Sequence, residues 1–122
     1  MVQYCSKVER ADLDRADLDS AFSALSDTTR RGILEQLAQR SASISDLAQR
    51  FEMTLTGMKK HVAVLEQAGL VSSEKRGRVR TCRLGPRRLD REAAWIERYQ
   101  STLEARLDSL AEFLERGADF DA

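Results

Sequence analysis

The stretch SDLAQRFEMTLTGMKKHVAVLEQAG, residues 45–69, decides the fold, because it predicts two helices joined by a tight turn. Ser45 is suited to cap a short helix over 46–51, and residues 52–53 are expected to form the turn. Thr54 is a good N-cap for a second helix over 55–68, and Gly69 stands where a left-handed glycine ends a helix. Together these features form a helix-turn-helix signature.

The flanking segments add helices at both ends and a hairpin. Asp27 is suited to cap a helix over 28–39, and an amphipathic helix is expected to precede it from about residue 13. The segments LVSSEKR and RVRTCRL flank Gly77 and predict a β-hairpin. A long helix over about 89–115, ended by Gly117, follows. The sequence thus predicts a mainly α fold with a small β-hairpin, a winged helix-turn-helix with N- and C-terminal dimerisation helices.

Length and composition suit one domain. The 122 residues can bury one core, and we assign 13–117 to it, 1–12 to a flexible N-terminal tail and 118–122 to a second tail. The longest apolar runs are far short of the ~20 residues that cross a bilayer, and the N-terminus lacks the apolar core of a signal peptide. We therefore expect a cytoplasmic protein with no membrane partner.

Charge is unevenly distributed, although the formal net charge is +0. The two ends are acidic and the middle is basic. Residues 72–91 alone hold eight basic side chains against Glu74 and Asp90. A local basic stripe matters more to nucleic acid than the total charge does.

Four segments resemble one family in its own order. SALSDTTRRGILEQL (23–37), MTLTGMKKHVAVLEQAGLV (53–71), RGRVRTCRL and the terminal helix are similar to the arsenic-repressor-like (ArsR/SmtB) winged helix-turn-helix regulators of prokaryotes. Thr28, Lys59 and Val62 depart from the family's usual proline, serine and leucine. The resemblance implies a homodimeric, sequence-specific DNA-binding transcriptional regulator, a repressor, whose recognition helix 55–68 enters the major groove of a palindromic operator in double-stranded DNA.

The candidate DNA-binding residues lie on that helix and on the wing, 70–84. Plotted at 100° per residue, one arc of the helix is apolar and the other is polar, and the N-terminal part of the polar arc can enter a groove. The charged wing tip would flank this helix, so we expect it to contact phosphate or the minor groove, the alternative being a tip that is merely solvated or protects an edge strand. The alternatives are a solvated helix face and a winged-helix protein-interaction module without DNA binding. The candidates are Thr54, Thr56, Gly57, Lys59, Lys60, Lys75, Arg76, Arg78 and Arg80, with Arg30 and Arg31 as weaker ones.

The apolar stripe of the terminal helix is wider than one small domain can cover. The resemblance implies an isologous homodimer, whose alternative is packing of the same residues within one chain. The expected interface residues are Leu18, Phe22, Leu25, Trp95, Ile96, Tyr99, Leu103, Leu107 and Leu110.

The sequence gives no sign of a cofactor, a metal site or an enzyme. The helix before the recognition helix has no cysteine, and the terminal helix has no histidine. Cys82 is expected to be half-buried and inert. His61, the one histidine, falls inside the apolar arc, so we expect it to pack inward with a ring nitrogen bonded to a neighbour. A metal- or thiol-responsive repressor with an unrecognised sensing site stays open as an alternative, and no effector is indicated.

Overall fold

The computed structural model describes residues 15–121, and the chain folds as two compact units divided between Arg88 and Leu89. The first unit begins with a helix described over residues 15–25. The tail predicted over 1–12 lies outside the described residues, as does Leu13. The remaining elements are α2 (Thr28–Gln39), β1 (Ala42–Ser43), α3 (Ile44–Arg50), α4 (Leu55–Gln67), β2 (Val71–Arg76), β3 (Val79–Leu84) and, in the second unit, α5 (Asp90–Asp121).

The predicted caps of α2 and α4 are confirmed. The Arg30 amide donates to Oδ2 of Asp27 at 3.0 Å, and the Gly57 amide donates to Oγ1 of Thr54 at 3.0 Å. Gly69 has a φ of 78°, the left-handed value that lets the chain leave α4. The start of α2 and both ends of α4 are therefore set by the residues that the sequence indicated.

The predicted start of α3 is wrong by two residues. Ser43, not Ser45, caps this helix, and its hydroxyl accepts from the Asp46 amide at 3.0 Å. Ala42 and Ser43 form a short strand that pairs with Cys82 and Thr81 of β3. This strand fixes the extended backbone that an N-cap needs, so the helix begins at Ile44. The sheet consequently has three strands in the order β1-β3-β2 instead of two.

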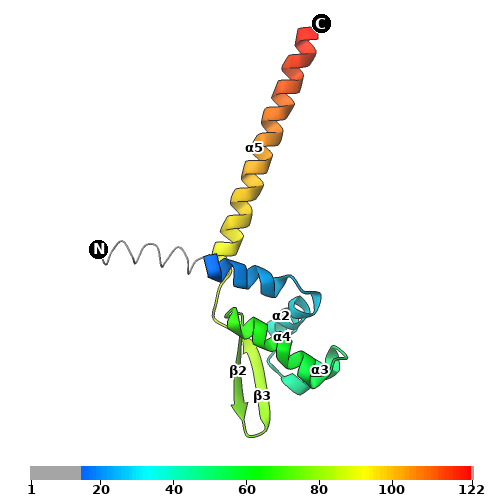
Figure 1. Ribbon diagram of the computed structural model, residues 1–122, viewed down its shortest axis with the longest axis vertical. Helices are drawn as coiled ribbons and strands as arrows, with labels where there is room; N and C mark the ends of the chain where they lie inside the picture. The colour runs from blue at the N-terminus through cyan, green and yellow to red at the C-terminus, as the bar shows by residue number, and fades with distance from the viewer. Residues whose placement is uncertain (1–14, 122) are drawn as a thin grey trace, which may run out of the picture. The chain divides into compact units, whose positions relative to one another are not determined.

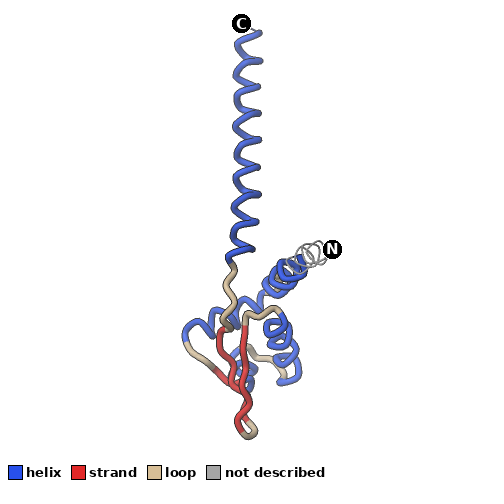
Figure 2. The backbone as a smooth tube through the Cα atoms, turned by 90° about the vertical axis from the view of Figure 1, so that its left-hand side faces the viewer, coloured by secondary structure: helices blue, strands red, loops and turns tan. Residues whose placement is uncertain are grey.

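The β2–β3 hairpin projects beyond the helices of the first unit (Figures 1 and 2). Arg76 pairs with Val79, so Gly77 and Arg78 form a two-residue loop, and Gly77 has the positive φ of 63° that such turns require. At the other end of the hairpin the Gly85 amide donates to the Leu70 carbonyl at 2.9 Å. The hairpin is thus anchored at its base, and its tip is free to reach a partner.

The core of the first unit lies between the three packed helices and the sheet. It buries the apolar stripe of α2, the inward face of α3 and one face of α4, and the sheet packs against these helices. This packing leaves the polar face of α4 exposed beside the hairpin. The fully buried large side chains are Ile33, Leu47, Met58, Val62, Leu65 and Cys82.

The second unit is the continuous helix α5. It continues past Gly117, where the sequence predicted its end. A single glycine costs a helix only about 1 kcal/mol, so a glycine alone does not end it. The rings of Trp95 and Tyr99 stack with their centroids 5.7 Å apart. The large apolar side chains exposed along it are Trp95, Ile96, Tyr99, Leu103, Leu107, Leu110, Phe113 and Leu114.

Candidate nucleic-acid interface

A groove of about 650 Å³ separates α4 from the hairpin. Lys59 comes from α4, and Lys75, Arg78 and Arg80 come from the hairpin. Ser43 and Ser45, at the start of α3, also line the groove. Four of the predicted DNA-binding side chains therefore meet around one hollow, although up to 21 residues separate them in the sequence. The groove's walls carry positive charge from both sides, which suits an anionic partner.

The wing residues do not all face this groove. Lys75 and Arg80 are cross-strand partners and share the groove face of the hairpin. Arg76, one residue further along β2, lies on the opposite face, where its Nε is 3.5 Å from Oε1 of Glu74. The alternation of a strand separates the two faces, and the sequence-based set did not distinguish them.

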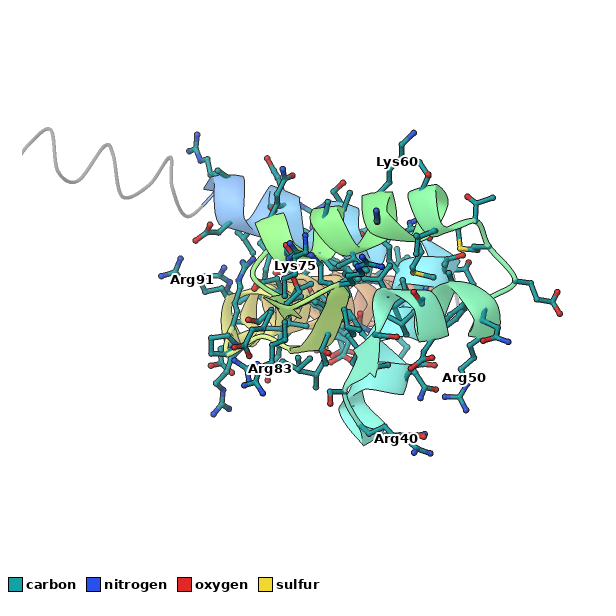
Figure 3. All side chains as sticks on the ribbon, turned by 90° about the horizontal axis from the view of Figure 1, so that it is seen from below. Arg40, Arg50, Lys60, Lys75, Arg83 and Arg91 are labelled. Carbon is teal, nitrogen blue, oxygen red and sulfur yellow. The ribbon has the colours of Figure 1, made fainter. Side chains whose placement is uncertain are left out.

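The two lysines of α4 also diverge. Lys59 lines the groove. Lys60 points away from the hairpin, whereas Lys75 lies on the hairpin side of α4 (Figure 3). Thr56, like both lysines, is exposed. Successive helical residues are 100° apart, so adjacent lysines reach different parts of a partner.

Thr54 and Gly57 are engaged with each other at the start of α4. The Gly57 amide donates to the Thr54 hydroxyl, so this amide is occupied by the cap. A side chain at Gly57 would place its Cβ 3.1 Å from the same oxygen. These two residues shape the first turn of α4, and Thr54 remains exposed beside Thr56.

Arg30 and Arg31 have structural partners. Arg30 donates through Nε to the Ala24 carbonyl at 2.8 Å and through Nη2 to the Ser23 carbonyl at 2.9 Å, and Arg31 donates to the Leu25 carbonyl at 2.8 Å. Both arginines thus cap the end of the helix over residues 15–25. The sequence indicated them only as weaker DNA-binding candidates. A contact that reaches back over six residues has no local sequence signal.

His61 is partly buried and packs against α2, which agrees with the predicted inward packing. Its Nδ1 lies 3.4 Å from Nη1 of Arg30 and 3.8 Å from Oδ2 of Asp27. The hydrogen bond from the Arg30 amide lowers the pKa of Asp27. Partial burial raises this pKa, and the charges of Arg30 and His61 lower it further. His61 therefore contributes to the packing of α4 on α2.

Glu66 and Arg80, which both line the groove, are joined through Ser73 by a polar chain that the sequence did not predict. Ser73 of β2 donates to Oε1 of Glu66 of α4, and Nη1 of Arg80 donates to the Ser73 hydroxyl at 2.9 Å. Glu66 lies on the polar arc of α4, and Ser73 is two residues before Lys75 on the same strand face. The helical and strand periodicities could have placed each residue on its face. The packing of the hairpin against α4, which brings the two residues together, leaves no signal in the sequence.

Cys82 is fully buried, not half-buried as predicted. Burial, followed by the nearby charge of Glu66, raises its pKa to about 11, which keeps the thiol protonated and unreactive at neutral pH. Among residues 15–121, no three His, Cys, Asp or Glu side chains gather as a metal site would require. No helix in this described part is long and apolar enough to span a membrane.

The residues expected at a dimer interface lie in both units. Leu18, Phe22 and Leu25 are partly exposed on the helix over residues 15–25. The six on α5 are exposed and follow one stripe. Such a stripe on a helix predicts a partner surface of similar character.

The chain is similar in sequence and fold to known transcriptional regulators. Residues 25–74 match a family described as a helix-turn-helix domain. The chain is 39% identical over 69 residues to the uncharacterised HTH-type transcriptional regulator YuzN of Bacillus subtilis, covering 51% of this chain and 75% of that protein. It is 32% identical over 60 residues to the transcriptional repressor SdpR of the same organism, covering 49% and 67%.

Two solved structures are similar in fold. An ArsR-like transcriptional regulator from Rhodococcus sp. RHA1 matches with a TM-score of 0.70 and 36% identity, covering 82% of this chain and 92% of that one. The homodimeric winged helix-turn-helix DNA-binding domain Mb0332 of Mycobacterium bovis matches with a TM-score of 0.55 and 24% identity, covering 84% and 88%. At that identity the second match supports the fold alone.

Proposed function

Because the chain belongs to the ArsR family of helix-turn-helix transcriptional regulators, we propose that it is a homodimeric, sequence-specific repressor that binds a palindromic operator. Its recognition helix is α4 and its wing is the β2–β3 hairpin. We propose that residues 13–117 act as a single domain that includes both units. The protein would bind DNA in the cytoplasm of a prokaryotic cell.

The groove between α4 and the hairpin is the observation that carries the proposal. In duplex DNA a sugar–phosphate strand separates the major groove from the adjacent minor groove. If α4 enters the major groove and the hairpin tip reaches the minor groove, that strand must occupy the space between them. The lysines and arginines that line this space provide the charge that a phosphate strand requires.

The geometry divides the predicted residues into two roles. Side chains that line the groove, Lys59, Lys75, Arg78 and Arg80, bind phosphates and supply affinity. Thr56 and Lys60, which are exposed outside the groove, approach base edges and supply sequence preference. Thr54 and Gly57 hold the first turn of α4 at the DNA. Arg76, on the far face of the hairpin, makes the smallest contribution of the set.

Dimerisation is proposed through the apolar stripe of α5 together with Leu18, Phe22 and Leu25. The exposure of that stripe supports a second copy as its partner, since a two-fold axis would pair the stripe with itself. The Mycobacterium bovis neighbour is described as homodimeric. Two recognition helices related by a two-fold axis read two half-sites, which is why the operator is proposed to be palindromic.

Repression is proposed because the similar protein SdpR is described as a transcriptional repressor. A protein-interaction module without DNA binding is the less favoured function. It would need neither a lysine in the recognition helix nor three basic side chains on the facing hairpin.

The decisive experiment is selection of bound duplexes from a random DNA pool, followed by binding measurements over a salt series. We expect an enriched palindromic sequence and an affinity that falls linearly with the logarithm of salt concentration. Transcription from a promoter carrying that sequence should fall when the protein is present. Selection that enriches no sequence, together with binding that does not respond to salt, would contradict the proposal.

A further inference from the structure

Three side chains link the recognition helix to the wing through one hydroxyl group. The Ser73 hydroxyl donates to the Glu66 carboxylate and accepts from the Arg80 guanidinium at 2.9 Å. The three residues belong to α4, β2 and β3 respectively. A serine hydroxyl has one proton to donate and lone pairs to accept, so it can join an anion to a cation in this way. We call this chain of bonds the Ser73 relay.

The relay orients Arg80, which is otherwise exposed. Its cross-strand neighbour is Lys75, a like charge that would push the guanidinium away. An exposed arginine without a fixed partner samples many rotamers, and that freedom is lost when it binds a phosphate. A hydrogen bond to Ser73 reduces this freedom before DNA arrives. Both bonds of the relay involve a charged group, and such bonds are the stronger kind.

Glu66 is an unexpected residue in a DNA groove. It lines the same hollow as the four cationic side chains, where its negative charge opposes a phosphate. Simple electrostatics therefore predicts that its removal would tighten DNA binding. If Glu66 strengthens DNA binding despite this repulsion, it must do so by positioning other side chains. Its hydrogen bond with Ser73 allows it to do so.

We propose that Glu66 and Ser73 are positioning residues that hold Arg80, and with it the hairpin, at the separation from α4 that a phosphate strand requires. The inference rests on the proposed function, since it concerns the same groove. It assigns to Ser73 an effect on DNA affinity although this residue need not touch DNA, and to Glu66 an effect opposite in sign to that of its charge.

The first test measures binding of a fluorescent duplex of mixed sequence over a salt series. Ser73→Ala should weaken binding about fivefold and lower the slope of log affinity against log salt by up to about one, the loss of one phosphate contact. Ser73→Thr, which restores a hydroxyl, should recover both. Ser72→Ala is the matched control, because Ser72 is the preceding residue on β2 and pairs with Arg83 on the other face. Glu66→Ala should weaken binding.

A double-mutant cycle then asks whether Ser73 acts through Arg80. In an Arg80→Ala background, adding Ser73→Ala should change affinity no further, whereas independent roles would add. Tighter binding by Glu66→Ala, additive effects in this cycle, or equal affinities for Ser73→Ala and Ser72→Ala would each overturn the relay.

A readout without DNA separates the relay from the proposed function. Ser73 pairs with Cys82, which is fully buried. Cys5 is the chain's other cysteine, so alkylation in a Cys5→Ser background is specific to Cys82 and reports movement of the hairpin away from α4. Ser73→Ala and Glu66→Ala should speed alkylation, and Ser72→Ala should not. If the wild-type protein bound no duplex, the proposed function would fail, and alkylation rates unaffected by Ser73→Ala would independently overturn the relay.

Discussion

Nδ1 of His61, in the middle of α4, lies 3.8 Å from Oδ2 of Asp27, the residue that caps α2. Nη1 of Arg30 approaches the same ring nitrogen at 3.4 Å, while the Arg30 amide donates to the Asp27 carboxylate. One carboxylate therefore begins a core helix and also faces the recognition helix. This contact couples the start of α2 to the position of α4, and it explains the chain's one histidine without a metal or a catalytic step.

The first prediction concerns acid stability. The pKa of Asp27 is lowered in the folded protein, chiefly by the Arg30 amide. The group therefore contributes stability above about pH 4, which is lost as the pH falls through the folded value. Asp27→Asn keeps an oxygen for the cap and removes the charge. Urea midpoints measured from about pH 6 to about pH 2 should fall less steeply for Asp27→Asn than for the wild type. Parallel curves would contradict the assignment.

The second prediction concerns alkaline stability. The pKa of Cys82 is raised from 9.0 to about 11, because burial disfavours the thiolate. The neutral thiol contributes stability that is complete below about pH 9 and is lost as the pH rises through about 11, an effect on the order of 2 kcal/mol. In a reduced Cys5→Ser background, Cys82→Ala should be less stable at neutral pH but should lose less stability between about pH 8 and about pH 11. An unchanged pH slope would show that the thiol titrates normally.

The third prediction compares two glycines. A Cβ at Gly85 would lie 2.4 Å from the Gly69 carbonyl oxygen, a backbone atom that cannot move aside, so Gly85→Ala should cost about 1–3 kcal/mol in the free energy of unfolding. Gly117→Ala is the control, because a Cβ there meets nothing within 4 Å. Since Gly117 is helical, alanine should strengthen α5 by up to about 1 kcal/mol. Chemical denaturation of both variants should give opposite signs.

The fourth prediction separates the two faces of the hairpin and of α4. Lys59→Ala should weaken binding about equally for all duplexes and reduce the salt slope by about one. Arg76→Ala removes the same charge from the opposite face and should have a smaller effect. Lys60→Ala should instead alter the sequence that a random pool yields. If Arg76→Ala and Lys59→Ala matched in salt slope, the groove would not be the phosphate site.

The fifth prediction tests the dimer. Leu107 is 56% exposed on the apolar stripe of α5, so Leu107→Asp should bury a charge at the proposed interface and shift the protein to monomers. Ala105→Asp is the matched control, because it adds the same charge to the same helix about 200° around from Leu107. Sedimentation equilibrium distinguishes these outcomes. A dimer that tolerated Leu107→Asp as well as Ala105→Asp would remove α5 from the interface.

Much of the fold could be predicted because its signals are local. Asp27, Thr54 and Gly69 act on amides and carbonyls within a few residues, so their roles in starting or ending helices are visible in sequence. The winged helix-turn-helix architecture follows from their order. The strand Ala42–Ser43 was missed because two residues carry no periodic pattern, and it forms only through pairing with β3. That pairing also moved the cap of α3 from Ser45 to Ser43.

The candidate interface, like the fold, was predicted only in those features that depend on local sequence. Composition and helical period selected the basic residues of α4 and the hairpin, since charge and residue type belong to the chain itself. Which of them face one another was decided by the register of the sheet and by the packing of α4 against it. That register turned Arg76 away from the groove, brought Lys59 to Lys75 and Arg80, and joined Glu66 to Ser73. Such relationships depend on contacts between residues distant in sequence, and only the folded chain brings those residues together.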